Sequence, residues 1–81
     1  MFQEEYFIVF PEGDVQEIPR RLRIDMLVDI NGNELTLPLA THRMIVFRVS
    51  RIHNREYKGG NASYHYLESM SAEELIPFTK R

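Results

Sequence analysis

The sequence of 81 residues contains no cysteine, which excludes a disulfide framework, a thiolate metal site and a cysteine nucleophile. It also has no run of about 18 apolar residues, so no segment is expected to span a membrane as a helix. The first five residues, Met-Phe-Gln-Glu-Glu, are acidic where a signal peptide would be basic. A soluble, cytoplasmic protein without a membrane partner is therefore expected.

Basic residues are absent from positions 1–19, which carry five carboxylates. Residues 20–58 carry eight basic and four acidic side chains, although the whole chain has a net charge of −2. This asymmetry fits either a face that binds a polyanion or the pairing of oppositely charged strands. Because the local excess is small, the pairing of strands is favoured.

The length predicts a single domain, residues 1–81. A chain of this size buries only about 63% of its unfolded surface, so the core of a single copy is expected to give little net stability. Burial of more surface in a homo-oligomer would increase the stability of the fold.

The clearest local pattern lies between Leu22 and Leu39 and predicts a β-hairpin that turns at Asn31-Gly32. Apolar residues occupy every second position on both arms, as in strands with one buried face. They are Leu22, Ile24, Met26, Val28 and Ile30 on the first arm and Leu35, Leu37 and Leu39 on the second. Asn-Gly is the strongest short hairpin signal, and only a loop with an even number of residues keeps the apolar faces together.

Three further regions are predicted to form strands. The first is a strand at residues 4–10 followed by a return strand at 15–18. The others are a long strand at 44–52 and a hairpin of 53–58 with 62–70 around Gly59-Gly60. The buried face of the long strand changes near Ser50, which is typical of a β-bulge. At the C-terminus, Ser71 and Glu74 form a capping box for one helical turn before Pro77.

The predicted fold class is therefore all-β. The expected architecture is a small antiparallel bent sheet or partly open barrel of five to six strands, similar in size to SH3 and OB barrels. A single C-terminal helical turn would pack onto its open end.

Two segments are apolar on both faces, beyond what a sheet with one buried face needs. Strands at interfaces are expected to show this excess of apolar residues. The candidate subunit interface, with a second copy or a protein partner, consists of Tyr6, Phe7, Ile8, Val9, Phe10, Met44 and Val46.

The third hairpin has the most distinctive polar surface. If Gly59-Gly60 is its loop, one face carries His53, Arg55, Tyr57, Tyr64 and Tyr66. Aromatic rings alternating with cations on a strand surface can stack nucleic-acid bases and hold phosphates. The same residues also suit a plain sheet surface, with half-buried tyrosines and cations over their rings. The plain surface is favoured, and a nucleic-acid face is the alternative.

No pattern in the sequence indicates catalysis or a cofactor. His42, His53 and His65 lack the close spacing of metal ligands, and a site around the last two would need a third ligand. The serines lack an activating motif, and no glycine-rich phosphate loop with its lysine and helix is present. A small metal-dependent enzyme is therefore the least favoured hypothesis.

The leading hypothesis is a non-enzymatic binding or assembly module that self-associates or docks a protein partner. It rests on the thin core of a short chain and on the two segments that are apolar on both faces. Single-stranded nucleic-acid binding through the third hairpin is the second hypothesis.

Overall fold

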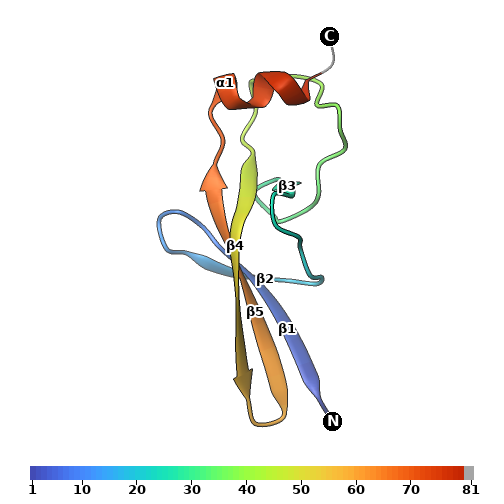
Figure 1. The fold of residues 1–81 in the computed structure, drawn as a ribbon, viewed down its shortest axis with the longest axis vertical. Helices are drawn as coiled ribbons and strands as arrows, with labels where there is room; N and C mark the ends of the chain where they lie inside the picture. The colour runs from blue at the N-terminus through green and yellow to red at the C-terminus, as the bar shows by residue number, and fades with distance from the viewer. Residues whose placement is uncertain (80–81) are drawn as a thin grey trace.

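Five strands form one strongly curled sheet in the computed structural model, which describes residues 1–79 (Figure 1). The strands are β1 (Gln3–Val9), β2 (Val15–Ile18), β3 (Leu27–Val28), β4 (Phe47–Tyr57) and β5 (Gly60–Ser69). A short helix, α1 (Ala72–Leu75), and a 3-10 turn, η1 (Ile76–Phe78), follow at one end. The predicted class is confirmed, because the fold is a mostly-β half-barrel with one C-terminal helical turn.

Strand β1 lies inside the sheet, which has the order β2-β1-β5-β4-β3. It pairs antiparallel with β2 and parallel with β5, so the sheet is mixed where an antiparallel one was predicted. This position explains why the strand is apolar on both faces. Ile8, and Phe10 directly after the strand, are buried in the core. Phe7 and Val9 are half-buried on the opposite face.

Strands β4 and β5 form the long hairpin predicted from the third region. Its loop is Lys58-Gly59, one position earlier than predicted, and Gly59 has a φ of 91°, which glycine tolerates readily. Opposite residues are therefore shifted by two positions relative to the predicted register. Because side chains alternate with a period of two, the shift leaves each of them on its predicted face.

The first part of β4 differs from the prediction. The strand begins at Phe47, whereas Met44 was expected to be its first residue. The ladder to β5 is irregular between Val49 and Arg51. This irregularity confirms the predicted change of face near Ser50.

The predicted hairpin between Leu22 and Leu39 is wrong in its length and register, although the chain does reverse about Asn31-Gly32. The N–H of Asp29 donates to the carbonyl oxygen of Asn33, and that of Leu35 to the carbonyl oxygen of Leu27, both at 3.0 Å. Only Leu27–Val28 forms a strand there, and it pairs with β4. An isolated bridge places Val28 opposite Glu34, which is an odd register and not the even one predicted. The alternating apolar residues are therefore divided between core and surface.

The turn of this segment is organised by the side chain of Asp29. Its Oδ1 accepts hydrogen bonds from the backbone N–H groups of Asn31 at 2.8 Å and Asn33 at 3.0 Å. Aspartate bonds of this kind compete with the ladder of a two-residue hairpin. Gly32 at the tip is buried, and a Cβ there would lie 3.0 Å from the side chain of Ile18. The turn therefore packs against the core.

The apolar core has two parts. The larger one consists of Ile8, Phe10, Ile18, Leu22, Val28, Phe47, Val49 and Leu67, and the smaller one of Leu27, Leu39, Val46 and Leu75. The rings of Phe10 and Phe47 meet edge to face, 5.3 Å apart, within the larger part. The curled sheet thus encloses one part, and the second joins the sheet to α1.

The C-terminal turn has the predicted capping box. The N–H of Ser71 donates to the Glu74 carboxylate at 2.8 Å, and the Glu74 N–H donates to Ser71 Oγ at 3.1 Å. These bonds lower the pKa of Glu74. Leu75 is fully buried, whereas the next residue, Ile76, is 52% exposed. In residues 1–79, no helix has the length and apolar character needed to cross a membrane.

Candidate functional site

The structure brings together the five residues predicted to share one face of the β4–β5 hairpin. They are His53, Arg55, Tyr57, Tyr64 and Tyr66. His65, between the two tyrosines of β5, is buried on the core side, so alternation places those tyrosines on the opposite face. We call this the outer face of the sheet. Aromatic and basic side chains lie next to each other on it.

The aromatic rings of the outer face already have partners within the chain. Phe7 and Tyr64 stack with their centroids 5.1 Å apart and an angle of 15° between the rings. The guanidinium of Arg51 lies over the ring of Tyr66, 4.2 Å from its centroid. A nucleic-acid base would have to displace these contacts or add to them.

Tyr57 reaches across β5 to contact β1. Its hydroxyl donates to Oε1 of Glu5 at 2.5 Å, and this bond, together with partial burial, raises the pKa of Tyr57. The ring passes over Gly60, where a Cβ would lie 2.6 Å from the Tyr57 oxygen and 2.5 Å from the carbonyl oxygen of Gln3. The tip of the hairpin is thereby tied to β1.

The backbone of β4 is unpaired along most of its outer edge. Strand β3 pairs only with the first two residues of β4. The Val49 carbonyl oxygen then accepts a hydrogen bond from the N–H of Asp25 at 2.8 Å, and the Val49 N–H donates to the carbonyl oxygen of Met26 at 3.0 Å. Beyond the bulge, residues 51–57 pair only with β5 within the described part of the chain. We call this segment the free edge of β4.

Two arginines, Arg51 and Arg55, lie on the free edge. Arg51, His53 and Arg55 are exposed on the outer face, and Glu56 is the one carboxylate of the segment. Both ion pairs found among residues 1–79 lie elsewhere. Sequence reasoning missed this edge, although a nearly continuous polar stretch at 50–58 is typical of an edge strand.

The seven candidate interface residues are divided between core and surface. Ile8, Phe10 and Val46 are buried in the chain's own core, and Tyr6 packs against it, whereas Phe7, Val9 and Met44 stay partly accessible. The apolar side chains of both segments thus pack largely within one chain. The side chains that stay at least partly accessible to another molecule are those of Tyr6, Phe7, Val9 and Met44.

The histidines occupy different environments. His53 is exposed, His42 is half-buried, and His65 is fully buried, which lowers its pKa. In the chain as far as Thr79, no three His, Asp or Glu side chains gather closely enough to hold a metal ion. The sequence-level hypothesis of a metal site gains no support from this arrangement.

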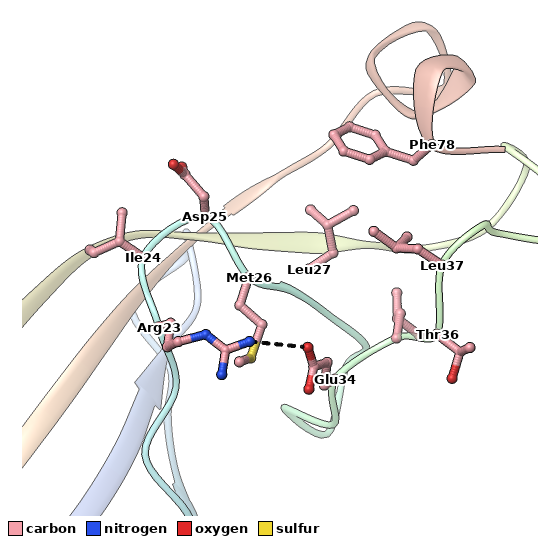
Figure 2. A pocket seen from close by; sticks show the side chains of 10 residues that line it. Arg23, Ile24, Asp25, Met26, Leu27, Glu34, Thr36, Leu37 and Phe78 are labelled. Atoms are coloured by element: carbon pink, nitrogen blue, oxygen red, sulfur yellow. Dashed lines mark hydrogen bonds and ion pairs between the residues drawn. The ribbon is translucent and has the colours of Figure 1, made fainter.

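The surface of residues 1–79 includes two hollows, and the larger of these has a volume of about 500 Å³. Figure 2 shows Leu27 and Phe78 directed into its apolar part, with Arg23 and Glu34 paired at one side. The smaller hollow, of about 390 Å³, lies between β2 and the turn at Ile30. Neither adjoins the free edge of β4.

The fold and its surface define a small half-barrel β domain in which the unpaired edge of β4 carries two arginines. The chain belongs to a family described as "Uncharacterised Treponema protein", whose model matches residues 2–78. No curated protein and no solved structure matches the chain.

Proposed function

We propose that the domain is a non-enzymatic binding module that docks an extended segment of a protein partner against the free edge of β4. The length of this edge carries the proposal, because residues 51–57 lack a second strand partner in the described chain. Unpaired N–H and C=O groups of an exposed edge can hydrogen-bond an added strand. Such main-chain bonds give affinity, and the neighbouring side chains give specificity.

The free edge is held in place before any partner arrives. The hydrogen bond from Tyr57 to Glu5 and the stacked rings of Phe7 and Tyr64 join β4 and β5 to β1 along the same part of the sheet. An edge that is already ordered loses little conformational entropy on binding. This rigidity supports docking without a large rearrangement.

The charges beside the edge favour an acidic segment. Arg51, His53 and Arg55 would lie next to the side chains of an added strand on the outer face. Opposite charges across such a contact speed association and fix its register, whereas a basic segment would be repelled. The partner segment is therefore extended, acidic and able to form a β-strand.

Single-stranded nucleic acid is the second candidate ligand. Tyr64 and Tyr66 lie beside the same cations, as base-stacking surfaces require. The intramolecular contacts of both rings, with Phe7 and with Arg51, make this candidate the weaker one.

Nuclear magnetic resonance titration of the isotope-labelled chain tests strand docking. The probe is a short synthetic peptide that alternates Glu and Val, and the matched control alternates Lys and Val. We expect the acidic peptide to shift the amide signals of residues 51–57 and the basic one to leave them unchanged. Arg55→Glu should weaken binding several-fold, whereas Arg43→Glu, in an exposed loop, should not. Shifts confined to other regions, or equal binding of both peptides, would contradict the proposal.

A further inference from the structure

The two ends of the sheet carry opposite charges. Strand β2 is the terminal strand at one end, and the exposed carboxylates of Glu12, Asp14 and Glu17 lie on it or next to it. No basic residue occurs in the chain before Arg20. The free edge of β4, near the other end, carries the cations described above. The sheet thus has one acidic and one basic edge.

The two edges also have compatible directions. Strand β2 is antiparallel to β1, β1 is parallel to β5, and β5 is antiparallel to β4, so β2 and β4 run the same way. Glu17, Phe7, Tyr64 and His53 are successive partners across these strands and share the outer face. A second copy placed so that its β2 continues the sheet beyond β4 would therefore pair these strands in parallel with the outer faces aligned.

We propose that the segment docked at the free edge of β4 is β2 of a second copy of this chain, so that copies join head to tail. The inference rests on the proposed function and identifies its partner. Glu17 of one copy would lie beside the cations of the next. Because the two surfaces differ, the contact is heterologous and each added copy exposes a new edge. Strand twist would turn the row of copies into a helical assembly.

The same charges oppose pairing between identical edges. Two β4 edges related by a two-fold axis would place Arg51 of one copy beside Arg55 of the other, and like charges on adjacent strands are destabilising. Glu56 does not offset this repulsion, because alternation places it on the opposite face. Two β2 edges would likewise bring carboxylates together. Only the contact of an acidic edge with a basic one combines opposite charges.

Charged side chains on edge strands can also serve only to prevent aggregation. The two roles predict opposite responses to salt. If the charges attract the edges, screening weakens association, whereas if they only repel, screening strengthens it. Since β2 has four residues, its ladder is short, and association should appear only at high protein concentration.

Sedimentation velocity of the full chain, over a dilution series, tests the head-to-tail contact. It compares about 20 mM with about 500 mM salt, where the Debye length falls from about 20 Å to about 4 Å. We expect species larger than a dimer at high concentration and low salt, and association several-fold weaker at high salt. A monomer throughout, a closed dimer, or association that strengthens with salt would overturn the inference.

Charge reversal sharpens the test. Glu17→Lys and Arg55→Glu should each abolish association alone, because each gives both edges the same charge at the contact. An equal mixture of the two variants should restore it, because each supplies the edge that complements the other. Arg43→Glu and Glu73→Lys are matched controls at exposed positions outside both edges and should behave as the parent chain. Circular dichroism verifies that the variants are folded.

The outcomes separate the inference from the proposed function. If the peptide of Glu and Val binds the free edge while the chain stays monomeric, the docking function stands and the identity of its partner is wrong. If neither the peptide nor a second copy binds there, both proposals fail. A mixture of charge-reversed variants that does not associate also contradicts the head-to-tail contact.

Discussion

The backbone N–H of Leu22 donates a hydrogen bond of 3.1 Å to Nε2 of His65, which lies on β5. The other ring nitrogen, Nδ1, lies 2.8 Å from the carbonyl oxygen of Phe7. A neutral histidine with its proton on Nδ1 makes both bonds at once. The ring thus joins β1, β5 and the segment after β2 inside the core, and burial lowers the pKa of His65.

Stability should therefore decrease as the pH falls below about 6.5. The unfolded chain binds a proton at His65 near its ordinary pKa, whereas the folded chain, with its lower pKa, does not, so acid favours unfolding. Urea unfolding between about pH 7.5 and about pH 5.5 should show a slope of at most about 1.4 kcal/mol per pH unit from this residue. His65→Gln should flatten the profile, whereas Ser69→Ala, at an exposed position without a titratable group, should leave its slope unchanged. An unaltered profile in His65→Gln would refute this account of the buried ring.

Replacement of Gly60 by alanine should destabilise the fold by about 1–3 kcal/mol. The added Cβ would lie 2.5 Å from the carbonyl oxygen of Gln3 and would also meet the ring of Tyr57, so β1 or the ring must move. Chemical denaturation measures the change. Ser69→Ala, at an exposed position of the same strand, is the control and should change stability by less than about 0.5 kcal/mol. Equal stabilities for the two variants would show that β5 does not need glycine at position 60.

Gly32→Ala should also cost at least about 1–2 kcal/mol, because position 32 has a φ of 79° and lies against Ile18. Asn31→Ala is the matched control, since only the backbone of Asn31 bonds to Asp29 and its side chain is exposed. Thermal unfolding of both variants checks the difference. A small effect at both positions would mean that the turn does not pack against the core as described.

Nucleic-acid binding makes a separate prediction for the outer face. If bases stack there, Tyr64→Ala and Tyr66→Ala should each weaken binding of an unstructured oligonucleotide by about 1–3 kcal/mol. Because both rings have intramolecular partners, we expect no such binding in fluorescence anisotropy, even at low salt. Binding that weakens with salt and is lost in both variants would establish the alternative ligand.

Local patterns in the sequence predicted the parts of the fold that depend on near neighbours. The capping box of Ser71 and Glu74 and the bulge near Ser50 are where the sequence places them. The outer face was predicted although the loop is displaced by one residue, because the displacement moves the register by two and preserves alternation.

The segment from Leu22 to Leu39 could not be predicted in the same way. Its alternating apolar residues suit a hairpin, but Asp29 satisfies two N–H groups of the turn and Gly32 packs against side chains of distant strands. These contacts override the local preference. The parallel pairing of β1 with β5 and the free edge of β4 also depend on partners far along the chain.

Residue-by-residue hydrogen exchange of the β4 amides tests whether the free edge docks a strand. We expect some amides of residues 51–57 to exchange quickly in the dilute chain, because no second strand pairs with them within the described residues. Addition of the peptide of Glu and Val should slow the exchange of those amides and leave the Arg43 loop unchanged. Amides that are all protected before addition, or that remain unprotected at saturating peptide, would contradict the claim that this edge docks a strand.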